Sequence, residues 1–291
     1  MATASDTSSE MRPPTVDDAG ELGRICFEAF RAIAERHNFP PDFPSAEVAA
    51  GLMSMLISHP NIYGVVAEKD GRLLGSNFLD ERSEIAGVGP ITIDPSSQDS
   101  GVGRRLMENV MARAAEQRFP GVRLLQAAYH TRSLSLYAKL GFEVRDVLAT
   151  MQGEAIGESL PGHLVRAARQ DDIEECSRLC ADAHGHDRAG EVRDAVTQGA
   201  AQVVESDGEI VGYTTGVAFF GHSVAATNDA MKALIAAAPG FGGPGFLLPP
   251  RNTELFNWCT QRGLRVVQLM TLMTHGVYQT PKRPFLASIL Y

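Results

Sequence analysis

The pattern of hydrophobic and polar positions predicts that the chain opens with two helices followed by a hairpin. The helical periodicity covers about residues 17–34 and 45–58. Two strand-like runs follow at about 63–69 and 72–80, and an Asp-Gly pair separates them. This dipeptide between two apolar runs is typical of a β-hairpin turn.

The next part of the chain continues the alternation of strands and helices. A strand is expected at about 86–93, a helix after the stretch QDSGVGRR, an apolar strand at VRLLQAAY, a short helix at SLSLYAKL and a last strand at FEVRDVLAT. Strands interleaved with helices in this way indicate an α/β fold of the α+β type, with a mixed sheet and helices on both of its faces.

Three short sequence matches recur in the same order in both halves of the chain. They pair RPPTVDD with RAARQDD, VAEKDGRLLG with VVESDGEIVG, and HTRSLSLYAKLGF with NTELFNWCTQRGL. Each match is weak alone, but the shared order favours two copies of one architecture over a single large α/β domain.

The tandem interpretation divides the chain as follows. We expect two domains at residues 12–151 and 164–291, after a small, polar and disordered tail at 1–11. Residues 152–163 form the linker, because Gly, Pro and Ser cluster where the periodicity stops.

Composition and charge exclude several classes of partner. The 291 residues carry a formal net charge of -9, which gives no reason to expect nucleic acid or an anionic membrane as a partner. No segment approaches the ~18 consecutive apolar residues of a membrane span. The four cysteines form no CxxC pair, so we expect reduced thiols and a cytoplasmic protein.

The stretch QDSGVGRR, Gln98 to Arg105, places two arginines in the first turn of a predicted helix. Gly101 and Gly103 let the backbone approach a ligand closely, and a helix start offers free N–H groups and a positive dipole end to an anion. Without an anion, Arg104 and Arg105 each cost roughly 0.3–1 kcal/mol there. The alternative is a glycine-rich turn that happens to precede two solvated arginines.

This stretch lacks the spacing of the GxGxxG and GxxxxGK[ST] phosphate motifs. It resembles instead the Q/R-x-x-G-x-G signature of the Gcn5-related N-acetyltransferase (GNAT) family, which Gln98, Gly101 and Gly103 match. LYAKLGF, Leu136 to Phe142, is similar to the family's LYxKxGF box. The resemblance implies two tandem GNAT-like domains and a CoA-dependent acyl transfer to an amine.

The resemblance also implies where acetyl-CoA, the acyl donor, would bind. The main chain before the loop would pair with the pantetheine arm, and the loop amides would hold the pyrophosphate. His130 stands where the family usually has Asn, and a purely structural role is its alternative. The implied positions are Ile91, Thr92, Ile93, Gln98, Asp99, Ser100, Gly101, Val102, Gly103, Arg104, Arg105 and His130.

Tyr137 matches the tyrosine that commonly serves the family as general acid for the departing sulfur. A phenol of ordinary pKa, about 10, carries its proton at neutral pH. The alternative is an aromatic side chain that only packs against the helix. No base for the amine is identified; Asp80, Glu81 and Glu84 are candidates for the acceptor side, with solvated surface acids as the alternative.

The second copy lacks the donor motif and has Cys259 at the position of Tyr137, so we expect a degenerate domain that binds no CoA and shapes the acceptor side. Cys176, Cys180 and His184 share one helical face, a spacing that suggests a metal site. Their first-copy counterparts are Leu22, Cys26 and Phe30. We therefore expect a packed face and no metal.

These observations predict an N-acetyltransferase, an acyltransferase of class EC 2.3.1.-, acting on a primary amine of a small-molecule acceptor. The competing hypothesis is a catalytically idle module that binds acyl-CoA or has a regulatory role. Either a monomer or a homodimer fits the sequence, and the acceptor amine is not specified by it.

Overall fold

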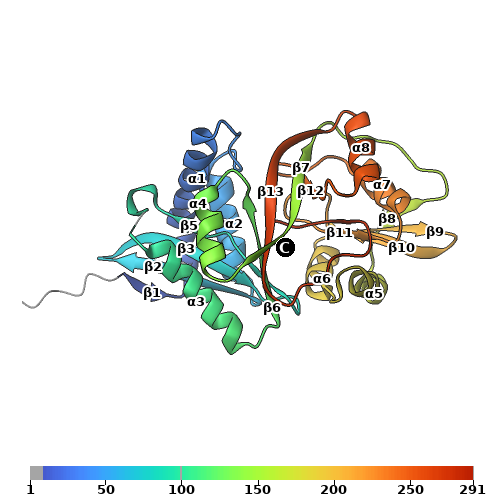
Figure 1. The fold of residues 1–291 in the computed structure, drawn as a ribbon. Helices are drawn as coiled ribbons and strands as arrows, with labels where there is room; N and C mark the ends of the chain where they lie inside the picture. Colours follow the sequence, from blue (N-terminus) through green and yellow to red (C-terminus); the bar gives the residue numbers. More distant parts are fainter. Residues whose placement is uncertain (1–8, 99, 291) are drawn as a thin grey trace, which may run out of the picture. The chain divides into compact units, whose positions relative to one another are not determined.

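The computed structural model describes residues 9–98 and 100–290, which form two compact units (Figure 1). The first unit holds the described residues up to Asp80 together with Val88–Arg118, and the second holds Glu81–Gly87 together with the described residues from Phe119 onward. The chain therefore contributes two separate segments to each unit.

The first unit contains an antiparallel sheet in the order β1-β2-β3, with β5 paired to β3. Three helices pack on these strands, and α1 lies so close to α2 that a Cβ added to Gly23 would be 2.4 Å from Cα of Ala50. The elements are β1 (Glu10–Arg12), η1 (Val16–Asp18), α1 (Ala19–Arg36), α2 (Ala46–Ser58), β2 (Ile62–Lys69), β3 (Arg72–Asp80), β5 (Thr92–Ile93), η2 (Pro95–Ser97) and α3 (Val102–Glu116).

Two details of this unit refine the expectations from sequence. Residues 10 and 11, which we assigned to the tail, belong to β1, because Arg12 forms ion pairs with Asp18 and with Glu68 of β2. The Asp-Gly hairpin turn is present, with positive φ at Asp70 and Gly71 as such turns require.

The strand expected at 86–93 consists of two pieces, β4 (Ala86–Val88) and β5. Gly89 and Pro90 separate them, because Gly89 takes a φ of 139° and a proline nitrogen cannot donate to a sheet ladder. β5 is thereby free to pair with β3, while Ala86 and Gly87 pair in parallel with β6.

The second unit contains two sheets. One runs β4-β6-β13-β7-β12, and β13, the long strand near the end of the chain, pairs antiparallel with both β6 and β7. The other runs β14-β11-β10-β9-β8. The strands are β6 (Gly121–Ala127), β7 (Glu143–Gln152), β8 (Leu164–Ala167), β9 (Gln202–Ser206), β10 (Glu209–Thr214), β11 (Ser223–Ala225), β12 (Phe246–Leu248), β13 (Arg265–Gly276) and β14 (Phe285–Leu286).

Helices cover both faces of the second sheet. Neighbouring residues of a strand point to opposite faces. Val203 of β9 belongs to one apolar core with Cys180 of α5, whereas Val204 belongs to another core with Leu234 of α7. The helices of this unit are α4 (Thr131–Lys139), η3 (Gln170–Asp172), α5 (Ile173–His184), α6 (Ala189–Thr197), α7 (Asn228–Ala237) and α8 (Thr253–Gln261).

The face of α5 that suggested a metal site is buried in an apolar core. Cys176 and Cys180 are fully buried, and the edge of the His184 ring contacts the Phe285 ring. Within residues 9–98 and 100–290, no group of three or more His, Cys, Asp or Glu side chains is arranged to hold a metal ion. Nor does any helix in these ranges have the length and apolar character needed to cross a membrane.

Candidate active site

Helix α3 begins directly after Gly101, whose φ of 84° lies in the left-handed region that glycine adopts without strain. In the part of the chain that the structure describes, no side chain caps this helix and its first turn contains no acidic residue. The first N–H groups of a helix have no partner inside the helix. The start of α3 therefore has the features of an anion site.

The two arginines of the first turn both have partners within the protein. Arg104 Nε donates to Glu108 Oε1 at 2.8 Å on an exposed face, a pairing worth at most about 1 kcal/mol. Arg105 donates to Ser9 Oγ at 2.7 Å and to the Ser9 carbonyl at 2.6 Å. Arg104 can thus exchange its partner for a stronger anion at small cost, while Arg105 holds residue 9 against α3.

Asp94 anchors the chain where it leaves β5 for this loop. Its carboxylate accepts from Ser96 N at 2.9 Å and from Ser96 Oγ at 2.6 Å, and it pairs with Arg72 at 3.1 Å and Arg24 at 3.2 Å. Burial alone would raise the pKa of Asp94, but these hydrogen bonds outweigh it and lower the pKa to about 2. Sequence reasoning missed this residue, since Arg24 lies 70 positions away.

The main chain at residues 91–93 pairs with a neighbouring strand along one of its two edges. Thr92 and Ile93 pair with Ser76 and Gly75 of β3, and among the described strands none pairs with the other edge of β5. An extended arm can add to such an edge as a further strand. Ile93 also contacts the loop, because a Cβ on Gly103 would lie 3.1 Å from Ile93 Cδ1.

Helix α4 aligns three polar side chains. His130 precedes its first residue, and its Nδ1 lies 2.6 Å from Ser133 Oγ. The ring of Tyr137 packs edge-on against Phe142 with 6.2 Å between centroids. Tyr137 is only 5% exposed, and burial raises the pKa of its phenol to about 12, so it carries its proton at neutral pH. Helical spacing was the signal that would have revealed the contact of Ser133 with His130.

The three acceptor-side acids have different surroundings. Asp80 is buried at the end of β3, Glu81 is half-buried and Glu84 is exposed. The segment that carries Glu81 and Glu84 is held by α6: Arg82 Nη1 donates to Asp194 Oδ2 at 3.0 Å, and a Cβ added to Gly190 would lie 2.3 Å from the Arg82 carbonyl oxygen. Helix α6 thus fixes the course of this segment.

A buried polar chain lies behind α6. Arg188 donates to Glu191 Oε1 at 2.5 and 2.8 Å, Glu191 Oε2 lies 3.1 Å from His222 Nδ1, and His222 Nε2 lies 2.9 Å from the Tyr213 hydroxyl. Burial and the nearby Arg188 lower the pKa of His222 to about 4, so its ring is neutral at pH 7. Each of these four side chains thereby has a hydrogen-bond partner, as buried polar groups require.

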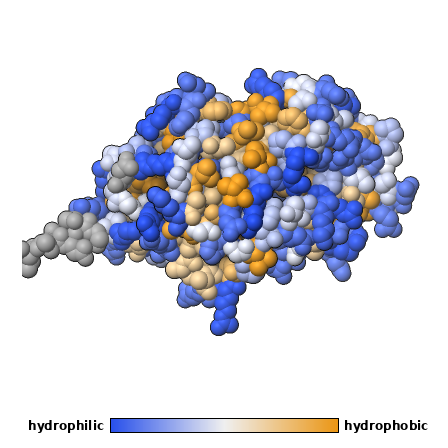
Figure 2. All heavy atoms as spheres, viewed as in Figure 1, coloured by the Kyte–Doolittle hydropathy of each residue, from blue (hydrophilic) through white to orange (hydrophobic). Residues whose placement is uncertain are grey.

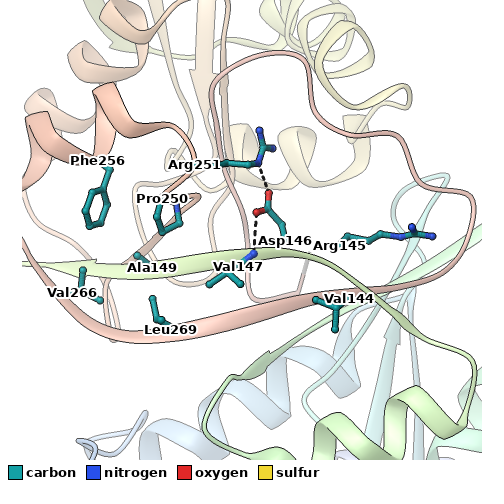
Figure 3. A pocket seen from close by; sticks show the side chains of 10 residues that line it. All are labelled: Val144, Arg145, Asp146, Val147, Ala149, Pro250, Arg251, Phe256, Val266 and Leu269. Carbon is teal, nitrogen blue, oxygen red and sulfur yellow. Dashed lines mark hydrogen bonds and ion pairs between the residues drawn. The ribbon is translucent and has the colours of Figure 1, made fainter.

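A separate groove of about 590 Å³ lies on the outer side of β7 and beside α8 (Figure 3). An ion pair of 2.7 Å joins Arg251 and Asp146 there, and four of the lining side chains are exposed and apolar. Figure 2 shows hydrophobic side chains at the surface where Figure 1 draws β7 and β13. No residue of the predicted site lines this groove. The lining is Val144, Arg145, Asp146, Val147, Ala149, Pro250, Arg251, Phe256, Val266 and Leu269.

The structure divides the predicted site residues between the two units. Asp80, the 91–93 main chain, and the described loop residues from Gln98 to Arg105 belong to the first unit. Glu81, Glu84, His130 and Tyr137 belong to the second. Asp99 lies outside the described residues.

Comparisons with known proteins agree with this fold. Residues 27–142 match the model of the acetyltransferase (GNAT) family. A putative acetyltransferase from Pyrococcus horikoshii superposes with a TM-score of 0.74 at 15% identity, covering 95% of this chain and 92% of that one. A GCN5-related N-acetyltransferase from Sphaerobacter thermophilus superposes with a TM-score of 0.63 at 15% identity, covering 96% and 98%. A comparison with curated protein sequences gave no match.

Residues 27–142 are therefore a domain of the acetyltransferase (GNAT) family, in a chain with a mixed α/β fold. The two solved structures resemble the chain along nearly its whole length, so the fold that they share extends well beyond the matched domain.

Proposed function

We propose that this chain transfers the acetyl group of acetyl-CoA to a primary amine of a small-molecule acceptor. The observation that carries the proposal is the start of α3, where a left-handed Gly101 precedes a first turn without an acid or a side-chain cap in the described chain. Within an acetyltransferase domain, this is where a pyrophosphate would find N–H groups and a positive dipole end.

The residues around this turn fit the donor. The loop amides and Arg104 would bind the pyrophosphate, and the open edge of β5 would pair with the pantetheine arm. Asp94, held by Arg24 and Arg72, keeps the loop entry in place before the donor arrives. Acetyl-CoA would supply the thioester, and the amine would attack its carbonyl carbon.

Tyr137 would act as the acid of this reaction. Its Oη keeps a proton at neutral pH, because burial raises the pKa of the phenol to about 12. The proton would pass to the sulfur as the C–S bond breaks and negative charge develops there. Glu81 and Glu84, on the segment that α6 holds, would face the amine and attract its positive charge.

We further propose that residues 164–291 are a degenerate copy of the domain that binds no CoA. Helix α7, the counterpart of α3, is capped by Thr227, whose hydroxyl accepts from Ala230 N at 3.2 Å, and Asp229 lies in its first turn. The cap occupies an N–H group that an anion would need, and the acid repels an anion, so the start of α7 is unsuited to bind a pyrophosphate. Cys259, at the position of Tyr137, is buried, and burial raises the pKa of its thiol to about 12.

A cytoplasmic location is part of the proposal. All four cysteines are free and buried, as expected where thiols stay reduced.

The test is to mix the protein with acetyl-CoA and a panel of primary amines and to follow the release of free thiol. We expect thiol release that depends on one class of amine, with the acetylated amine identified by mass spectrometry. Tight acetyl-CoA binding without thiol release on any amine would favour the idle acyl-CoA-binding module. Failure to bind acetyl-CoA would overturn both functions.

A further inference from the structure

The segment Glu81–Gly87 carries an exposed acid next to a fixed point of the main chain. The segment contains no helix or strand before Ala86, where it begins to pair in parallel with β6. Ile85, directly before this pairing, is buried. Glu84 is exposed, and among the residues that the structure describes none forms an ion pair with its carboxylate. The carboxylate of Glu84 is therefore available to a cation from solvent.

Helix α6 fixes the segment on the other side of Glu84. Arg82 Nη1 lies 3.0 Å from Asp194 Oδ2, and the side chain of Arg82 is only 14% exposed. The Arg82 carbonyl also lies so close to Gly190 that no side chain fits between them. One ion pair and one backbone contact thus set the position of the chain two residues before Glu84.

Helix α6 can hold the segment because buried side chains hold the helix itself. Glu191, one turn before Asp194, accepts from Arg188 at 2.8 Å and lies 3.1 Å from His222 Nδ1. Burial alone would raise the pKa of Glu191, but the charge of Arg188 and the hydrogen bond with His222 outweigh it and lower the pKa to about 2. Glu191 therefore ties α6 to the interior, while Asp194 ties the segment to α6.

We propose that Asp194 is a positioning residue for the acceptor: through Arg82 it holds the segment where Glu84 binds the ammonium group of the amine. The inference rests on the proposed acetyl transfer. A carboxylate on a segment that is already ordered binds a cation without the entropy loss of ordering that segment, so its affinity is higher. Asp194 belongs to the C-terminal half of the chain, which thus sets part of the affinity for the amine.

Steady-state kinetics with the amine and acetyl-CoA varied in turn test this role. We expect Asp194→Ala to raise KM for the amine on the order of tenfold, because the segment loses its attachment, while kcat and KM for acetyl-CoA stay unchanged. Asp194→Glu keeps a carboxylate for Arg82 and should restore most of the affinity. Asp182→Ala removes a similar ion pair, of 2.7 Å with Arg283, and is the matched control that should leave KM for the amine unchanged.

A second pair of variants tests whether Asp194 acts through Glu84. We expect Glu84→Gln to raise KM for the amine at least as much as Asp194→Ala does, because it removes the charge that binds the ammonium group. The double variant Asp194→Ala, Glu84→Gln should be no worse than Glu84→Gln alone, since both changes act on one carboxylate.

The outcomes separate the positioning role from the function on which it rests. No thiol release by the unaltered protein with any amine would overturn the acetyl transfer. In an active protein, an unaltered KM for the amine in Asp194→Ala or in Glu84→Gln would overturn the positioning role alone. The same conclusion would follow if Asp194→Ala raised KM for acetyl-CoA as much as KM for the amine, or if Asp182→Ala had an equal effect.

Discussion

Burial of the Tyr137 side chain keeps its phenol protonated. A phenol in water already keeps its proton at neutral pH, and the surroundings of Tyr137 raise its pKa further, to about 12. The group is thus unsuited to act as a base in the resting protein, and it would give its proton to the departing sulfur as the C–S bond breaks.

We expect Tyr137→Phe to lower kcat by about 10²-fold or more, with the affinity for acetyl-CoA nearly unchanged, because the ring still packs on Phe142 and only the proton donor is lost. Steady-state thiol release and binding calorimetry would measure the two effects. Tyr63→Phe removes a hydroxyl that donates to Asn109 and is the control for hydroxyl loss as such. An unaltered rate in Tyr137→Phe would exclude it as the acid.

The lowered pKa of Asp94 predicts that the stability of the protein depends on pH. Its pKa is about 2 in the folded protein and 3.8 in the reference state, so its ionised form stabilises the fold above pH ~4. That contribution is lost as the pH falls from about 4 to 2. Asp94→Asn should therefore lower the free energy of unfolding at pH 7 by roughly 1–3 kcal/mol, and the difference from the unaltered protein should disappear toward pH 2.

Urea unfolding at several pH values would test this prediction for Asp94. Asp207→Asn, in an exposed turn where Asn is well tolerated, is the matched control and should change little at any pH. A difference for Asp94→Asn that does not depend on pH would contradict the explanation.

The residues that the sequence revealed and those that it did not differ in a physical way. Gly101 and Tyr137 belong to short motifs in which neighbouring positions carry the signal. Asp94 with Arg24, and Arg82 with Asp194, are pairs that only the folded chain brings together. The contact of Ser133 with His130 could have been found from their helical spacing, because helix geometry is local.

At the scale of elements, helix α6 determines where the acceptor-side segment runs. The backbone of Arg82 approaches Gly190 so closely that no side chain fits between them. Neither α6 nor this segment carries a sequence signal for the contact, whereas the helices and the Asp-Gly hairpins were predictable because periodicity and turn chemistry are local.

We expect Gly190→Ala to destabilise the protein by about 1–3 kcal/mol, because the new Cβ must displace the Arg82 carbonyl. Helix propensity alone would make the same change stabilising by up to ~1 kcal/mol, so the sign of the effect identifies the contact. Chemical unfolding would measure it. Gly240→Ala, where nothing lies within 4 Å of the added Cβ, should be close to neutral, and equal effects at both sites would refute the explanation.

At the scale of the whole molecule, β13 joins parts of the chain that the sequence separates widely. It pairs with β6 and with β7, and β7 pairs with β12. The sequence predicted none of these three pairings, because they join residues from 95 to 155 positions apart. The domain limits at 12–151 and 164–291 stay a prediction, and the interleaved strands indicate that neither half would be complete alone.

A chain that ends at residue 163 should accordingly fail to fold. Without β13 and β12, the edges of β6 and β7 lose their hydrogen-bond partners, and buried residues such as Leu124 and Leu148 lose their cover. Circular dichroism during heating would test this, with no cooperative transition expected. A fragment 1–163 that unfolds cooperatively and binds acetyl-CoA would show that the first copy is autonomous.

The role of the α3 start in donor binding is tested most directly by calorimetry of acetyl-CoA binding to a protein with Arg104→Glu and Arg105→Glu. If the start of α3 holds the pyrophosphate, two acids in its first turn should abolish binding. Arg36→Glu with Arg118→Glu, both exposed, changes the net charge equally and should leave binding intact. We expect the unaltered protein and the control variant to bind acetyl-CoA and the α3 variant not to bind it. Unchanged affinity in the α3 variant, with its fold intact by circular dichroism, would contradict a pyrophosphate site at the start of α3.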